Sequence, residues 1–222
     1  IPTAAEIWRD KLPEGAPSFD QVAYIEAAKD TGAIYVDMLG ALSAHSDESI
    51  FYRTDHHWTS LGAYYGYTAL MDALGVEPEP LGEGETVSED FYGTLYSTSG
   101  VHWLQPDSIE RYISSDGITV EDVYNEETHG LYVDSFLSEK DKYSSFMGGN
   151  NPLYIIRNPN AATDKTLLVV RDSYSDSLAP FLTQYYSEIH LLDLRYNRTS
   201  VADYAEGNNI DEIFVCYSVE NF

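Results

Sequence analysis

The last third of the chain alternates short apolar runs with segments of helical pattern. Apolar runs fall at 167–170, 188–192 and 212–217, and the helical patterns at 173–185 and 200–206 separate them. A strand, a crossover helix and a second strand form a right-handed unit in which the two strands are parallel. The sequence therefore predicts an α/β fold built on a parallel sheet.

The first third of the chain predicts mainly helices. Helical patterns cover residues 18–29, 38–44 and 59–74, and a short strand is expected at 34–37. The length of 222 residues fits one large domain, so we predict a single domain over residues 1–222.

Residues 76–150 differ in character from the segments on either side. Prolines and glycines interrupt the segment, and acidic residues separate its β-like pieces. We therefore expect a β-rich insertion or lid within the domain. Its β-like pieces lie at 93–96, 111–114, 118–124 and 130–133.

The charge of the chain excludes several classes of partner. Thirty-seven acidic and 12 basic residues give a formal net charge of −25, which repels nucleic acid and anionic lipid surfaces. No stretch approaches the roughly 18 apolar residues of a membrane helix, so we expect no direct membrane insertion by this segment. The one cysteine, Cys216, lies in an apolar run and is expected in the core.

Two polar motifs carry the expected chemistry. The first crowds Asp55, His56, His57 and Trp58 just before the helix expected at 59–74, and the second places Ser173 directly after the strand at 167–170. Residues two apart on an extended loop project to the same side, so Asp55 can reach the His57 imidazole while His56 points away. An Asp/His pair and a serine at the end of a strand are the parts of a serine hydrolase or acyltransferase.

Each motif also has a plainer interpretation. Ser173, Asp55 and Thr54 are all residue types that cap helices. Asp55, His56 and His57 also resemble part of a metallohydrolase site, but the other histidines form no spaced set of ligands, so no metal and no cofactor are expected.

The two motifs resemble those of a known family. The sequences Tyr-Arg-Thr-Asp-His-His-Trp-Thr at 52–59, Arg-Asp-Ser-Tyr-Ser at 171–175 and Asp-Leu-Arg-Tyr at 193–196 look like the DHHW proteins of Gram-positive bacteria. That family is similar to the SGNH-hydrolase-like domains of alginate O-acetyltransferases, in which Asp-x-His-Trp precedes Gly-Asp-Ser. The resemblance implies a flavodoxin-like α/β/α sandwich with a mainly parallel sheet. It also assigns Ser173 as the nucleophile, with His57 and Asp55 as its partners.

The resemblance leaves several site residues less well defined. Arg171 stands where the related motif has glycine, and we expect it to crowd or recharge the nucleophile turn and to belong to the oxyanion or substrate-binding residues. Asn150 is the best candidate for the oxyanion asparagine of such folds, and a plain turn is the alternative. Arg195 is a candidate for substrate binding or for a surface ion pair. Tyr92 and Trp103 are candidate sugar platforms in the insertion.

The resemblance also implies a function. We expect serine-dependent transfer of an acyl group, acetyl in the first instance, to or from a cell-surface or extracellular polysaccharide. The sequence does not separate an O-acetyltransferase from an acetylesterase. A non-catalytic carbohydrate-binding or scaffold protein is the alternative. The expected partners are a carbohydrate acceptor and an acyl donor, which a membrane acyltransferase could supply. We expect an extracellular or cell-surface location, with anchoring through a segment before Ile1 left open.

Overall fold

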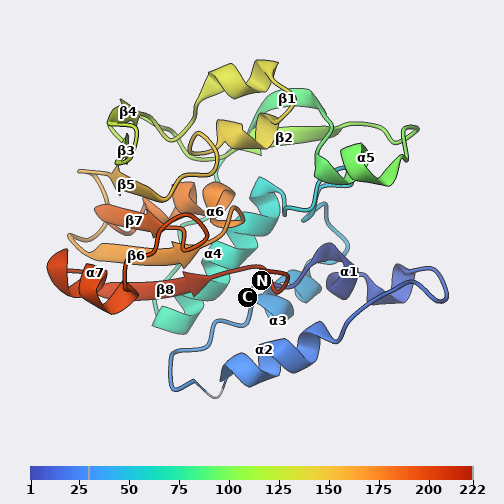
Figure 1. Ribbon diagram of the computed structural model, residues 1–222, viewed down its shortest axis with the longest axis horizontal. Coiled ribbons are helices and arrows are strands. Elements are labelled where there is room, and N and C mark those ends of the chain that lie inside the picture. The colour runs from blue at the N-terminus through green and yellow to red at the C-terminus, as the bar shows by residue number, and fades with distance from the viewer. Residues whose placement is uncertain (30, 222) are drawn as a thin grey trace.

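Six strands form one central sheet among residues 1–29 and 31–221, which the computed structural model describes. Asp30 and Phe222 lie outside the described residues. The strands are β3 (Thr119–Asp122), β4 (Glu127–His129), β5 (Leu153–Arg157), β6 (Thr166–Arg171), β7 (Glu188–Leu192) and β8 (Glu212–Cys216). Their order across the sheet is β4-β3-β5-β7-β6-β8, with β8 at one edge (Figure 1).

The sheet is mixed rather than mainly parallel. β6 pairs in parallel with β7 and with β8, as the alternation of strands and helices predicts. The other three pairings, β3 with β4, β3 with β5 and β5 with β7, are antiparallel. The prediction of a mainly parallel sheet is therefore wrong. The connections at 123–126 and 158–165 contain no helix, and a parallel crossover needs a dozen or more residues.

Helices cover both faces of the sheet. Leu167 and Val169 of β6 face α4 (Ser60–Leu74) and α6 (Ser175–Leu182), whereas Leu168 and Val170 face α7 (Val201–Gly207). Successive residues of a strand point to opposite faces, so an unbroken apolar run is what a strand between two helix layers requires. The α/β class is confirmed, and the end of β6 is held firmly on both sides.

The N-terminal part packs along the β8 side of the sheet. It contains α1 (Ala4–Ile7), the 3₁₀ turn η1 (Arg9–Lys11), α2 (Gln21–Lys29) and α3 (Met38–Ala44). The helix expected at 38–44 is confirmed over its whole length, and those expected at 18–29 and 59–74 are confirmed except that they begin at Gln21 and Ser60. The strand expected at 34–37 is wrong: the segment is irregular, Ile34 is 67% exposed, and no described strand lies beside it. None of the described helices is long and apolar enough to span a bilayer.

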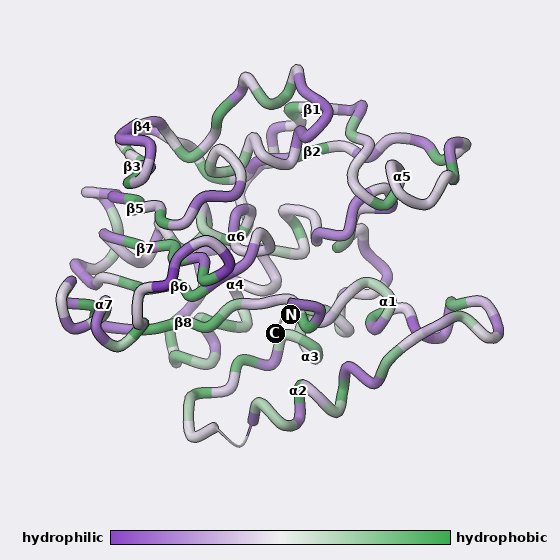
Figure 2. Tube along the Cα trace, viewed as in Figure 1, coloured by the Kyte–Doolittle hydropathy of each residue, from purple (hydrophilic) through white to green (hydrophobic). Residues whose placement is uncertain are grey.

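An apolar slot lies between the N-terminal part of the chain and β8, the edge strand of the sheet. The slot has a volume of about 680 Å³ and lies between β8 and residues of α2 and the segment at 33–36. Ile213 and Val215 of β8 line it and remain 50% and 57% exposed. Figure 2 shows β8 in the green of hydrophobic residues, although one of its edges has no partner strand in the sheet.

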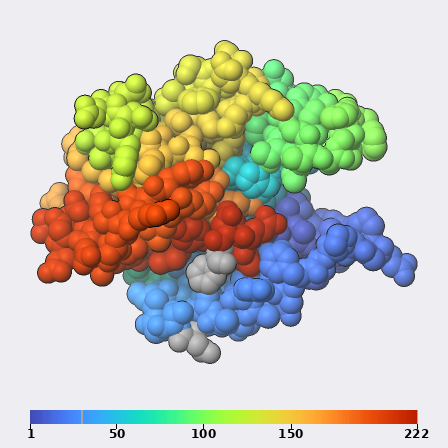
Figure 3. Space-filling model, in the orientation of Figure 1, coloured from blue at the N-terminus to red at the C-terminus, as the bar shows by residue number. Residues whose placement is uncertain are grey.

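Residues 76–150 form part of the sheet and a cap above it. β1 (Glu85–Phe91) and β2 (Asp107–Arg111) make a separate antiparallel pair, with α5 (Thr94–Ser99) between them. The 3₁₀ turns η2 (Asp134–Ser138) and η3 (Lys142–Ser145) follow β4. The β-like piece expected at 93–96 is instead the start of α5, whereas the piece at 118–124 contains β3. In the space-filling view the green and yellow parts of this segment lie side by side along the top (Figure 3). The division into one domain with an insertion stays a prediction.

Candidate active site

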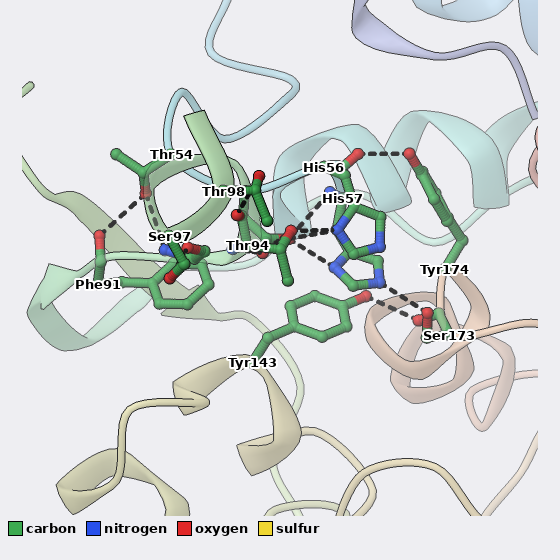
Figure 4. Close-up of polar contacts among 12 residues, drawn as sticks. Thr54, His56, His57, Phe91, Thr94, Ser97, Thr98, Tyr143, Ser173 and Tyr174 are labelled. Carbon is green, nitrogen blue, oxygen red and sulfur yellow. Dashed lines mark hydrogen bonds and ion pairs between the residues drawn. The ribbon is translucent and has the colours of Figure 1, made fainter. Parts of the chain in front are cut away.

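A continuous line of hydrogen bonds joins the two motifs. Nδ1 of His57 lies 2.6 Å from Oδ1 of Asp55, and Nε2 of the same ring lies 2.8 Å from Oγ of Ser173 (Figure 4). The sequence separation between His57 and Ser173 is 116 residues. Asp55 and His57 are buried, whereas Ser173 is half-buried. An imidazole so placed can take the serine proton while the carboxylate holds the ring in the required tautomer.

The Asp55 carboxylate is held by four donors. Oδ1 accepts from the His57 ring and from the His57 backbone N–H at 3.0 Å, and Oδ2 accepts from the backbone N–H and hydroxyl of Thr94 at 2.9 and 3.1 Å. Burial alone would raise the pKa of Asp55, but the hydrogen bond and charge of His57 outweigh it and hold the pKa well below its usual range. Gly93 is required beside it, because a Cβ there would lie 2.2 Å from Oδ2. Asp55 is therefore a fixed negative charge behind the imidazole.

Two rings enclose the His57 imidazole. Tyr143 of η3 stacks on it with ring centroids 3.8 Å apart and an interplanar angle of 7°, and the Tyr143 hydroxyl donates to the Ser173 carbonyl at 3.0 Å. His56 also lies against the ring, at 3.8 Å and 38°, so the prediction that His56 points away is wrong. Its Nδ1 bonds the Thr94 hydroxyl, and burial followed by the neighbouring His57 lowers its pKa. These contacts leave the His57 ring little freedom to rotate.

Hydrogen bonds to Asp172 and from Tyr174 hold the turn that carries Ser173 in place. Asp172 accepts hydrogen bonds from the backbone N–H of Tyr174 at 3.0 Å, from the N–H of Ser218 at 2.9 Å and from the side chain of Asn221 at 2.9 Å. The Tyr174 hydroxyl donates to the carbonyl of His56, which links the turn to the first motif. Ser173 thus sits between the carboxyl end of β6 and the first residues of α6, as predicted.

Arg171 lies behind the turn and does not reach the site. Its side chain has no exposed surface, and Nη1 pairs with Oδ1 of Asp176 at 2.7 Å. Nε and Nη2 have no hydrogen-bond partner among the described residues. Burial raises the pKa of Asp176 to about 7, although Arg171 acts in the opposite direction. A fully buried guanidinium cannot touch a substrate, so the expected role of Arg171 in substrate binding does not fit its position.

Asn150 and Arg195 lie together near the carboxyl end of β7. Nη2 of Arg195 pairs with Asp193 at 2.7 Å and also donates to Oδ1 of Asn150 at 3.2 Å. The hydrogen bond to Asp193 raises the pKa of Arg195, so the ion-pair alternative for Arg195 is the one that its contacts favour. The contact with Arg195 uses the Asn150 side-chain oxygen. The side-chain nitrogen has no hydrogen-bond acceptor in the described part of the chain.

The aromatic side chains of the first motif and of the insertion differ in exposure. Trp58 is fully buried and donates to the carbonyl of Tyr174 at 2.9 Å, so it packs and does not stack on sugar. Tyr92 is half-buried and lines a pocket of about 270 Å³ with Tyr96, and Trp103 is 78% exposed. Tyr92 is therefore placed where it can meet a ligand.

The first motif also meets the spacing of a metal site. One ligand atom from each of Asp55, His56 and His57 can be chosen so that all lie within 4.8 Å of one another, the one such group in the described residues. Asp55 Oδ1 and His57 Nδ1 already bond each other, and Asp55 Oδ2 and His56 Nδ1 both bond Thr94. A metal would have to replace these bonds.

Sequence reasoning missed Thr94 and Tyr143. Thr94 holds both Asp55 and His56, and Tyr143 covers His57. The pair Gly93-Thr94 carries the signal of a helix start, which could have located α5. Tyr143 has no local signal, because it is one of 19 tyrosines in the chain.

Comparisons with known proteins agree with this architecture. Residues 19–192 match the family model described as DHHW protein. A DHHW family protein from Eubacterium siraeum DSM 15702 has a TM-score of 0.82 and 29% identity, with 98% of this chain and 75% of that chain covered. A search of curated proteins returned no significant match.

Two more distant structures share the fold. Bacillus cereus PatB1, solved with a sulfonyl adduct, has a TM-score of 0.76 at 19% identity and covers 99% of this chain and 80% of its own. The O-acetyltransferase domain of Pseudomonas putida AlgJ has a TM-score of 0.55 at 16% identity, with coverage of 99% and 72%. At such identities the likeness establishes the shared fold.

Proposed function

The chain belongs to the DHHW protein family, and from that premise and the geometry of its site we propose that it moves an acyl group, acetyl in the first instance, to or from a polysaccharide by a serine-dependent reaction. The observation that carries this proposal is the unbroken line from Asp55 through His57 to the half-buried hydroxyl of Ser173, with contacts of 2.6 and 2.8 Å. The flavodoxin-like, SGNH-hydrolase-like arrangement is part of the same proposal.

The reaction would proceed in two steps. Ser173 Oγ attacks the carbonyl carbon of an acyl donor while His57 Nε2 takes its proton, and the donor's leaving group departs with that proton. A sugar hydroxyl or water then gives its proton to His57 and attacks the acyl carbon, and Ser173 leaves and recovers the proton. If a sugar attacks, the protein is an O-acetyltransferase, and if water attacks it is an acetylesterase. Asp55 stabilises the imidazolium in both steps.

Two hydrogen-bond donors are candidates for the oxyanion hole. The backbone N–H of Ser173 and the side-chain nitrogen of Asn150 have no acceptor within hydrogen-bond range among the described residues. Asn150 lies in the loop before β5, whose first residue, Leu153, pairs with Leu192 at the end of the sheet where β6 also ends. A donor that is free before substrate arrives can stabilise charge as it develops on the carbonyl oxygen.

The remaining parts of the proposal follow from the reaction. A polysaccharide substrate implies an extracellular or cell-surface protein. The acyl donor would reach Ser173 from a partner, for which a membrane acyltransferase is the candidate. AlgJ supports the choice of acetyl, because the domain with which this chain shares its fold is described as an O-acetyltransferase domain.

The test is a trapped acyl-enzyme. Wild-type protein, Ser173→Ala and His57→Ala are mixed with p-nitrophenyl acetate and examined by intact mass spectrometry. We expect an added acetyl group on the wild type, none on Ser173→Ala and much slower labelling of His57→Ala. Dialysis against EDTA should leave wild-type labelling unchanged, whereas loss of labelling would favour a metal site at Asp55, His56 and His57.

A sulfonyl fluoride gives an independent test. The Ser173 oxygen would displace fluoride from sulfur and His57 would take the serine proton, so the sulfonyl group should be found on Ser173 by peptide mapping. PatB1, which shares the fold, has been solved with a sulfonyl adduct. Equal and low reactivity of all three proteins toward both reagents would instead favour a non-catalytic carbohydrate-binding protein.

A further inference from the structure

A second cavity adjoins the candidate active site. It has a volume of about 270 Å³ and is lined by two segments of the chain, one with Tyr92, Tyr96, Ser97 and His102 and one with Lys140 and Lys142. Asp90 also lines it, and its carboxylate pairs with Lys142 at 3.2 Å. This volume is below the roughly 300–1,000 Å³ of pockets that enclose drug-sized ligands. The cavity therefore suits a single ring rather than a long chain.

Both lining segments contain or adjoin residues that touch Asp55 or His57. Tyr92 and Tyr96 flank Thr94, which bonds Asp55, and the backbone N–H of Tyr96 donates to the Thr54 carbonyl at 2.9 Å. In the second segment, Lys142 directly precedes Tyr143, which stacks on the His57 ring. Figure 4 shows Thr94 and Tyr143 next to the histidine rings, on the side away from Tyr174. A ligand in the cavity would thus lie beside the site.

The chemistry of the walls fits a sugar. The rings of Tyr92 and Tyr96 lie 4.4 Å apart at an angle of 44°, so together they offer an aromatic corner. Aromatic rings of this kind present a flat apolar face to a pyranose ring. Asp90 can accept hydrogen bonds and Lys142 can donate them, while Ser97 can do both, which matches the hydroxyl groups of a sugar.

The charge around the cavity selects among glycans. The two lysines are offset by Asp90 within the cavity and by Glu89, Glu139 and Asp141 beside it in the sequence. The chain as a whole carries a net charge of −25. A polyanionic glycan would be repelled on approach, whereas a neutral one would not.

We propose that this cavity binds one neutral hexopyranose ring of the acceptor glycan and presents a neighbouring hydroxyl to the acyl group on Ser173. The proposal rests on the proposed function for its role in transfer, but the binding itself can be tested without any chemistry. Tyr92 and Tyr96 are the sugar-contacting residues.

The binding experiment uses the Ser173→Ala protein and titration calorimetry with cellotetraose, chitotetraose and tetragalacturonate. We expect at least one neutral oligosaccharide to bind, tetragalacturonate to bind more weakly, and Tyr92→Ala or Tyr96→Ala to weaken neutral binding roughly fivefold or more. Tyr124→Ala is the matched control, because Tyr124 is 57% exposed and lies in the turn between β3 and β4, outside the cavity. Absence of neutral binding, tighter binding of tetragalacturonate, or equal effects of all three tyrosine substitutions would each overturn the proposal.

A transfer experiment separates this inference from the proposed function. Acetylated wild-type enzyme is mixed with the neutral oligosaccharide that binds best, and the ratio of acetylated sugar to free acetate is measured. Tyr92→Ala should lower that ratio roughly fivefold, while Tyr124→Ala should not change it. If no acyl-enzyme forms, the proposed function fails while the calorimetry still decides the cavity. If the acyl-enzyme forms and the ratio does not respond to Tyr92→Ala, the acceptor site fails and the serine chemistry stands.

Discussion

Replacing Asp55 by Asn tests the role of its charge. The side chain keeps its size, but all four of its hydrogen-bond partners are donors, two from His57 and two from Thr94. An amide NH₂ must therefore face a backbone N–H in either orientation. If it faces His57, the ring has to accept at Nδ1 and carry its proton on Nε2, where it can no longer take the Ser173 proton.

The size of the effect follows from the lost charge. Charge centres roughly 4 Å apart interact by about 4 kcal/mol at an effective dielectric constant of 20, which corresponds to roughly 10³ in rate. The wrong tautomer would increase the loss to roughly 10⁴. We therefore expect Asp55→Asn to slow formation of the acetyl-enzyme by roughly 10³–10⁴.

The assay is the burst of p-nitrophenolate from p-nitrophenyl acetate, with the adduct confirmed by mass. Thr94→Val is the matched control, because it removes the hydroxyl bonds to the same carboxylate at 3.1 Å and to His56 at 2.6 Å but leaves the Asp55 charge. The control should lose roughly fivefold. An Asp55→Asn rate within tenfold of the wild type, or a Thr94→Val loss as large as that of Asp55→Asn, would refute the electrostatic reasoning.

Three further predictions concern the support of the site. Gly93→Ala would put a carbon 2.2 Å from Asp55 Oδ2 and should slow formation of the acetyl-enzyme roughly 10²-fold. Gly207→Ala is the control, because a Cβ at Gly207 would have no atom within 4 Å and should not change the rate. Equal rates for the two variants would contradict the predicted clash. Tyr143→Phe keeps the aromatic ring on His57, so its rate of acetyl-enzyme formation should fall roughly fivefold. Tyr143→Leu removes the ring, and its rate should fall several-fold further. The opposite order would show that the ring stack does not contribute to the rate. Asp176→Leu leaves the buried Arg171 without its carboxylate partner and should lower the free energy of unfolding by about 3–5 kcal/mol in a denaturant titration. Adding Arg171→Met should restore most of that free energy. If it does not, the Arg171–Asp176 ion pair is not what the first substitution disrupts.

The central contact was predictable from two short-range features. Asp55 and His57 are only two residues apart, so their side chains meet although residues 53–57 bend and are not extended as predicted. Ser173 follows an apolar run whose residues face two helix layers, which places it at the end of a buried strand. Each feature is local, and the fold only has to bring the two segments together.

The rest of the site depends on contacts that are distant along the chain. Thr94 is 39 residues from Asp55, and nothing near it in the sequence marks it as the partner of a carboxylate. The prediction for Arg171 failed for a different reason: a charged residue beside the nucleophile is expected to face the site, but pairing with Asp176, the second residue of α6, allows its burial. His56 lies against His57 because the chain turns into α4 and does not stay extended.

The direction of the outer strands was also hidden. The alternation of strands and helices describes β6, β7 and β8 correctly, but it says nothing about β3, β4 and β5, which no α-helix connects to the next strand along the chain. The segment expected as a strand at 34–37 has the right composition and no partner, since β8 lies across the apolar slot.

The open edge of β8 has a practical consequence for work with the purified protein. Ile213 and Val215 remain half exposed there, next to backbone groups that lack a neighbouring strand within the described sheet. Edges of this kind recruit strands from other molecules. Concentrated samples should therefore self-associate through β8, and we expect Ile213→Lys to reduce this association, as measured by analytical ultracentrifugation.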